Sequence, residues 1–128
     1  MGSTCSVFAN KSIYLSYDIS SKDLKIWEFT ISLNKLPIKL FMNEISKINE
    51  SDIMIHLISN ATLKHHKQLN EINMGLNKIS IFIYTDCEVP NTINNNLSKN
   101  KKSISISYLN YNNFQEIFPI ILTKLNDL

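Results

Sequence analysis

The stretch DIMIHLIS, residues 52–59, is a nearly continuous apolar run about as long as one β-strand. A strand with one wet face alternates polar and apolar residues, whereas a strand covered on both faces does not. The run therefore predicts a central strand of a parallel sheet, and ISIFIY, residues 79–84, predicts a second strand of the same kind. His56 lies inside the first of these strands and is interpreted as a buried imidazole with hydrogen-bond partners.

Segments of strand and helix character alternate on both sides of these two strands, which is the pattern of βαβ units. We expect further strands at 12–17, 38–42 and 103–109, and helices at 21–34, 43–51, 60–78 and near the end of the chain. The stretch 103–109 alternates strictly and predicts an edge strand with one wet face. Five strands alternating with helices predict an α/β, flavodoxin-like doubly wound fold, a five-stranded parallel sheet with helices on both faces.

Apolar spacing predicts which side of each helix faces the sheet. In the final helix the apolar residues recur at the helical period, at Phe114, Ile117, Phe118, Ile121, Leu122 and Leu125. In 21–34 the predicted core stripe is Leu24, Trp27 and Ile31. In 60–78 it is Leu69, Ile72 and Leu76, and Glu71 points away from that stripe.

Composition favours one domain, residues 12–128, after a flexible tail at 1–11. The chain has thirteen basic residues, all of them lysine, and eleven acidic residues. The absence of arginine argues against a nucleic-acid partner. Cys5 and Cys87 offer neither a metal spacing nor a disulfide framework, which suggests a cytoplasmic location. We expect no metal site, because adjacent residues such as His65 and His66 diverge by about 100° on a helix.

The first six residues, MGSTCS, fit the N-myristoylation pattern with Gly2 as acceptor, and Cys5 offers a second lipid anchor. A membrane tether is one interpretation of this pattern, and the same letters also open many recombinant proteins. Glycine-rich phosphate loops are excluded because the chain holds only Gly2 and Gly75. P-loop ATPases and dinucleotide dehydrogenases are therefore not expected.

Several blocks, taken in order, resemble the TIR (Toll/interleukin receptor) domain family. IYLSYD (13–18) resembles the family's opening strand, and ESDIMIHLISNAT (50–62) resembles its third strand. Glu71 follows Ser59 by twelve positions, the spacing at which TIR domains place a glutamate in the next helix. The stretches 78–93 and 111–125 resemble the fourth strand and the closing helix, so the resemblance covers residues 12–126.

The resemblance implies an NAD-cleaving activity in defence or stress signalling, with NAD as substrate rather than as a cofactor. Glu71 would be the catalytic carboxylate that assists cleavage of the nicotinamide–ribose bond, with cyclisation of ADP-ribose as a possible outcome. The binding residues would be Ser16, Tyr17 and Asp18 at the end of the first strand and Ser59 at the end of the third.

Each of these residues also has a structural interpretation. Glu71 can be an exposed helix acid, and the run from Ser16 to Asp18 can be a capped turn. The chain departs from the family pattern at Lys67 and Gln68, where Trp-Cys is common, and in a shortened loop after the second strand. The alternative function is a non-catalytic interaction module that acts by self-association or by docking another TIR domain.

Overall fold

The computed structural model describes residues 11–17, 28, 30, 31, 33–35, 38–58, 70–72, 74, 78–85, 103–108, 111, 112 and 114–126. Its strands are β1 (Ser12–Ser16), β2 (Lys39–Met42), β3 (Ile53–Ile58), β4 (Ile79–Tyr84) and β5 (Ser103–Ser107). The 3₁₀-helix η1 (Ile45–Glu50) and the α-helix α5 (Phe114–Asn126) complete the bounded elements. Helical residues also occur at 28, 30, 31, 33 and 34 and at 70–72 and 74.

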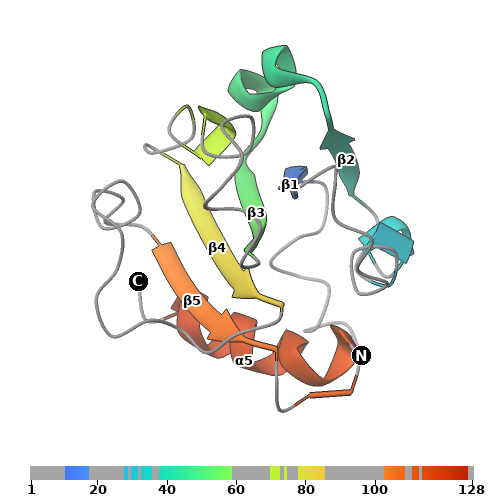
Figure 1. The fold of residues 1–128 in the computed structure, drawn as a ribbon, viewed down its shortest axis with the longest axis vertical. Coiled ribbons are helices and arrows are strands. Elements are labelled where there is room, and N and C mark those ends of the chain that lie inside the picture. The colour runs from blue at the N-terminus through green and yellow to red at the C-terminus, as the bar shows by residue number, and fades with distance from the viewer. Residues whose placement is uncertain are drawn as a thin grey trace.

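The five strands form one parallel sheet in the order β2-β1-β3-β4-β5 (Figure 1). This is the flavodoxin-like order, with β1 and β3 as neighbours where the chain changes direction across the sheet. The predicted fold class is confirmed, and each strand lies within two residues of its predicted bounds. β5 is an edge strand, and its two isoleucines are buried while its three serines are half-buried, as the alternation predicts.

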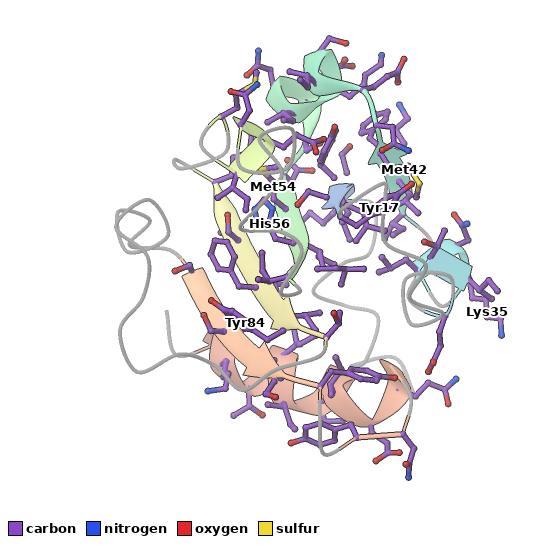
Figure 2. All side chains as sticks on the ribbon, viewed as in Figure 1. Tyr17, Lys35, Met42, Met54, His56 and Tyr84 are labelled. Carbon is purple, nitrogen blue, oxygen red and sulfur yellow. The ribbon has the colours of Figure 1, made fainter. Side chains whose placement is uncertain are left out.

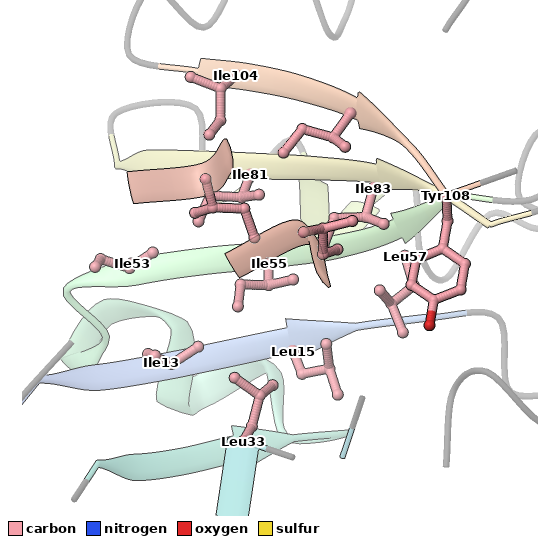
Figure 3. Packing of buried hydrophobic residues seen from close by; sticks show 13 residues of the cluster. Ile13, Leu15, Leu33, Ile53, Ile55, Leu57, Ile81, Ile83, Ile104 and Tyr108 are labelled. Atoms are coloured by element: carbon pink, nitrogen blue, oxygen red, sulfur yellow. The ribbon is translucent and has the colours of Figure 1, made fainter. Parts of the chain in front are cut away.

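One face of the sheet carries the largest apolar cluster. Its strand residues occupy alternate positions: Ile13, Leu15, Ile53, Ile55, Leu57, Ile81, Ile83, Ile104 and Ile106 (Figure 3). Ile117 and Ile121 of α5 pack on this face, together with Leu33 of the helical residues 28–34. The predicted core-facing side of the final helix is confirmed at those two isoleucines.

The opposite face holds two smaller apolar clusters. Tyr14 and Met54 pack with Ile48 of η1, and Phe82 and Tyr84 pack with Ile58 and Ile72. Ile72 belongs to the helical residues 70–72, so helical segments cover both faces of the sheet. The second face also carries buried polar side chains such as Ser16, His56 and Ser80, whereas the strand residues of the first face named above are all isoleucine or leucine.

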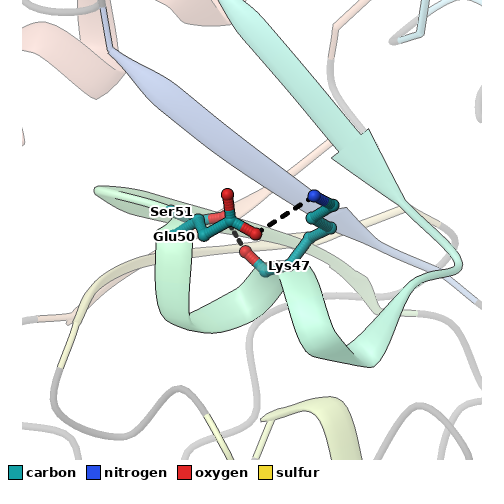
Figure 4. Close-up of polar contacts among 3 residues, drawn as sticks. All are labelled: Lys47, Glu50 and Ser51. Carbon is teal, nitrogen blue, oxygen red and sulfur yellow. Dashed lines mark hydrogen bonds and ion pairs between the residues drawn. The ribbon is translucent and has the colours of Figure 1, made fainter.

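The helix η1 follows β2 after only Asn43 and Glu44, so the connection is as short as the sequence predicts. Lys47 forms an ion pair with Glu50 at 3.1 Å, and Ser51 closes the helix by donating its hydroxyl to the Lys47 carbonyl oxygen at 2.9 Å (Figure 4). The ion pair joins a half-buried lysine to an exposed glutamate and contributes little to stability. The Ser51 hydroxyl, by contrast, satisfies a carbonyl that the helix end leaves open.

The stripe predicted for 21–34 is wrong at Ile31, whose side chain is 55% exposed. Leu33 is buried instead. The two positions lie about 200° apart around a helix, so the buried side runs through Leu33 and leaves Ile31 in solvent. Leu24 and Trp27 lie outside the described residues, and so does the predicted tail up to residue 10, including Gly2 and Cys5.

Candidate functional site

The buried polar side chains of the sheet gather on the face that η1 and residues 70–72 cover. Alternation along the strands sends Tyr14 and Ser16 of β1 to this face, together with His56 of β3. Figure 2 shows His56 beside Met54, the residue two positions earlier on the same strand. The same alternation turns Ile13 and Leu15 to the apolar face. A strand that reads as apolar therefore presents two hydroxyl groups to one side of the sheet.

Tyr14 joins three elements through its hydroxyl group. The hydroxyl donates a short hydrogen bond to Oε2 of Glu71, and it accepts the backbone N–H of Glu44 at 3.1 Å. Glu44 lies two residues beyond Met42, the last residue of β2. The Tyr14 hydroxyl therefore joins the middle of β1 to Glu44, which follows β2, and to Glu71. In the sheet register Tyr14 lies opposite Met54, the second residue of β3, and not level with the carboxyl ends of the strands, where ligands bind in doubly wound folds.

Glu71 is buried, with 2% of its surface exposed. The expectation that it points away from the core is therefore wrong, and so is its interpretation as an exposed helix acid. The adjacent Ile72 is buried as well, so the covered side of this helix is wider than the apolar stripe alone indicates. A buried carboxylate requires hydrogen-bond donors, and Tyr14 supplies one. Glu71 thus has a fixed position between its helix and β1.

The environment of Tyr14 keeps its hydroxyl protonated. Burial raises the pKa of Tyr14 well above its usual value of 10, and the hydrogen bond to Glu71 and the charge of that carboxylate raise the pKa further. A protonated phenol is the form that can donate to a carboxylate. At neutral pH the Tyr14 hydroxyl is therefore a neutral donor, and Oε2 of Glu71 is its acceptor.

Ser16 and His56 form a second buried polar pair. They are register partners in β1 and β3, and Oγ of Ser16 lies 2.5 Å from Nδ1 of His56. The imidazole ring stacks on Phe82, with 4.8 Å between ring centroids and 19° between ring planes. Among the described residues, Nε2 of His56 has no hydrogen-bond partner. The predicted buried histidine is confirmed.

Burial lowers the pKa of His56 to about 3, because charging an imidazole away from water is costly. His56 is therefore neutral over the physiological range, and one of its nitrogens is a donor while the other is an acceptor. A base this weak is poorly suited to activate the Ser16 hydroxyl as a nucleophile. The pair is better suited to joining the last residue of β1 to the middle of β3.

Tyr17 lies one residue beyond β1 and is half-buried. Its hydroxyl accepts a hydrogen bond from Nδ2 of Asn43 at 2.9 Å, which links the carboxyl ends of β1 and β2. Asn43 has φ of 59°, in the left-handed region where asparagine is enriched among residues other than glycine. Tyr17 thus stands at the rim of the sheet edge where the sequence predicts a binding site.

The predicted site residues fall into two groups. Glu71, Ser16 and Tyr17 lie among the described residues. Ser16 and Tyr17 are at the carboxyl end of β1, whereas Glu71 contacts Tyr14, in the middle of that strand, rather than Ser16 or Tyr17 in the hydrogen bonds above. Asp18 and Ser59 lie outside the described residues. The sequence interpretation missed Tyr14 as a partner of Glu71. The signal that could have found it is the two-residue period of β1, which puts Tyr14 and Ser16 on the same face.

Within the described part of the chain, no group of three or more His, Cys, Asp or Glu side chains could hold a metal ion. In that same part, no helix combines the length and apolar character needed to cross a membrane. No protein-family model, no curated protein and no solved structure matches the chain.

Proposed function

We propose that this chain is a TIR-like signalling domain that binds NAD and cleaves its nicotinamide–ribose bond in defence or stress signalling. The observation that supports the proposal is the contact of Glu71 with β1, because this residue comes from the helix before β4 and accepts the Tyr14 hydroxyl. The sheet order provides a switch point between β1 and β3, the usual place for a nucleotide in such a fold.

In the proposed reaction, the bond between the anomeric carbon of the ribose and the nicotinamide nitrogen breaks. The bonding electron pair leaves with the nicotinamide, which departs neutral, and the ribosyl carbon develops oxocarbenium character. The Glu71 carboxylate would stabilise that positive charge and orient the ribose hydroxyls. A water molecule then adds to the carbon and loses a proton, or a nitrogen of the adenine adds in its place to give a cyclic ADP-ribose.

Binding of the nucleotide would use the residues at the ends of β1 and β3. Tyr17 with its partner Asn43 offers an aromatic ring and hydrogen-bonding groups at the rim. Ser16 would contribute from the floor, and Asp18 and Ser59 are the further residues that the resemblance suggests. The protein would act in the cytoplasm, with a membrane tether only where Gly2 and Cys5 carry lipids.

The second candidate is a non-catalytic interaction module that works by self-association or by docking another TIR domain. The burial of Glu71 and Ser16 favours it, because both polar groups are almost inaccessible and already have partners within the domain. In that case the Tyr14–Glu71 and Ser16–His56 pairs serve only to hold the fold together. The short connection between β2 and η1 also leaves little chain to line a nucleotide site.

The two candidates are separated by following nicotinamide release from NAD with the wild-type protein, Glu71→Gln and Glu71→Ala. The enzyme proposal requires turnover that both variants lose. Turnover that survives in both would remove Glu71 from the catalytic role. An absence of turnover over a wide range of protein concentrations, together with concentration-dependent self-association in size-exclusion chromatography, would favour the interaction module.

A further inference from the structure

The carboxylate assigned to the reaction is closed off from solvent in this structure. Glu71 is 2% exposed and its hydrogen-bond partner Tyr14 is fully buried. A carboxylate that stabilises a ribosyl cation must come within contact distance of the ribose. The proposed reaction therefore requires the side chain of Glu71 to become accessible.

Tyr14 holds Glu71 in this position through a hydrogen bond. Its hydroxyl donates to Oε2 of the carboxylate and is itself oriented by the N–H of Glu44. Because Tyr14 also packs with Met54 and Ile48, the ring has no freedom to follow the carboxylate if the helix moves. The hydrogen bond is thus a fixed anchor on β1 for a residue on a separate helical segment.

Resting on the proposed function, we infer that the Tyr14–Glu71 hydrogen bond is an autoinhibitory contact that keeps the site closed. Opening the site breaks this bond and releases Glu71 toward the nucleotide. The signal that activates the domain would act by favouring the released position of Glu71.

The domain provides a matched comparison on the other face of the sheet. Tyr108 belongs to the large apolar cluster (Figure 3) and donates its hydroxyl to Oε1 of Glu28 at 2.9 Å. Tyr108→Phe therefore removes a second tyrosine–glutamate hydrogen bond without touching Glu71. Any effect shared by Tyr14→Phe and Tyr108→Phe reflects general loosening, and an effect confined to Tyr14→Phe reflects the contact itself.

The experiment measures access to Glu71 and turnover in the same samples. The proteins react with a water-soluble carbodiimide and glycine ethyl ester, and the rate of amide formation at Glu71 is read by peptide mass spectrometry. We expect Tyr14→Phe to speed labelling of Glu71 about tenfold, which corresponds to about 1.4 kcal/mol, and to raise nicotinamide release. Tyr108→Phe should leave the labelling of Glu71 and the turnover at wild-type values.

Each outcome bears on one proposal. Unchanged labelling of Glu71 in Tyr14→Phe overturns the autoinhibitory contact, whatever happens to NAD. Faster labelling with lower turnover also overturns it, because Tyr14 would then assist the reaction. Faster labelling without nicotinamide release in any variant supports Tyr14 as the restraint on Glu71 but contradicts the NAD-cleaving function.

A second substitution covers the case in which Tyr14→Phe does not fold. 4-Aminophenylalanine, incorporated at position 14, keeps the shape of the ring and a donor toward Glu71. Its N–H donates more weakly than the hydroxyl, and its nitrogen is a poor acceptor for the N–H of Glu44. It should give a labelling rate above that of the wild type, and a rate equal to the wild type would contradict the inference. Circular dichroism of each protein confirms that the folds compared are the same.

Discussion

Oγ of Ser16 lies 2.5 Å from Nδ1 of His56, and the two residues face each other in register across the β1–β3 pair. This contact joins the strands on either side of the point where the chain changes direction across the sheet. It leaves a neutral imidazole fully buried against Phe82. The pair gives the domain a specific sensitivity to acid.

The free energy of unfolding should fall as pH drops below 6.5. Burial holds the pKa of His56 at about 3 in the folded domain, whereas in the unfolded chain it returns to about 6.5. Between these values the unfolded chain binds a proton that the folded domain does not, so acid favours unfolding. The His56 contribution should amount to about 3 kcal/mol between pH 6.5 and pH 4, measured by urea unfolding at several pH values.

His56→Phe is the control for this pH dependence. It keeps an aromatic ring against Phe82 but cannot take up a proton. The variant should lose the His56 part of the slope even if its stability at pH 7 also changes. Equal slopes for the wild type and His56→Phe between pH 6.5 and pH 4 would show that His56 is not a buried neutral group.

Tyr14→Phe should lower the free energy of unfolding by about 1–3 kcal/mol. The substitution leaves a buried carboxylate and the N–H of Glu44 without the hydroxyl that now bonds both. Tyr108→Phe removes a single hydrogen bond in a less buried setting, so its cost should be nearer 1 kcal/mol. Urea unfolding of the two variants tests this ranking, which is wrong if Tyr108→Phe is the more costly.

Asn43 should tolerate glycine better than alanine. Its φ of 59° costs about 1 kcal/mol for a residue with a Cβ and no local hydrogen-bonding group, and little for glycine. Both substitutions lose the hydrogen bond to the Tyr17 hydroxyl. The difference in stability between the two variants therefore reports the cost of the left-handed backbone conformation. Asn43→Ala should therefore have the lower midpoint in thermal unfolding. A lower midpoint for Asn43→Gly would refute the left-handed conformation.

Ile55→Ala should cost about 3–4 kcal/mol of stability. Ile55 is fully buried in the central strand, in register with Leu15 of β1 and Ile81 of β4, so the truncation leaves a cavity. Ile31→Ala, at an exposed position, should change stability by less than about 0.5 kcal/mol. If urea unfolding showed that the two variants lose similar amounts of stability, the burial of Ile55 and the exposure of Ile31 would both be contradicted.

The strands could be predicted from the sequence because burial on two faces requires unbroken apolar runs such as 79–84. The edge strand β5 was predicted for a related reason, since one wet face produces alternation. The helix at 28–34 was harder because its apolar residues occur on more than one side. Spacing alone selected Ile31, whereas packing against the sheet selects Leu33.

The candidate site could be predicted only in part. The sequence pointed to Glu71 and to the end of β1. Glu71 does meet β1, but at Tyr14 in the middle of the strand rather than at its carboxyl end. It did not predict that Glu71 is buried, because this depends on a tyrosine hydroxyl that is 57 positions away in the chain. The two-residue period of β1 indicates on which face Tyr14 lies, but it does not identify the residue of a distant helix that Tyr14 bonds.

The most direct measurement of the central claim is the rate of nicotinamide release from NAD, followed by proton NMR for the wild type, Glu71→Gln and Glu28→Gln. Glu28 is the matched control because its carboxylate also accepts a tyrosine hydroxyl, on the opposite face of the sheet. We predict that Glu71→Gln slows release by at least about 100-fold while Glu28→Gln retains the wild-type rate. Equal rates for Glu71→Gln and the wild type, or no release by the wild type at any protein concentration, would contradict the claim.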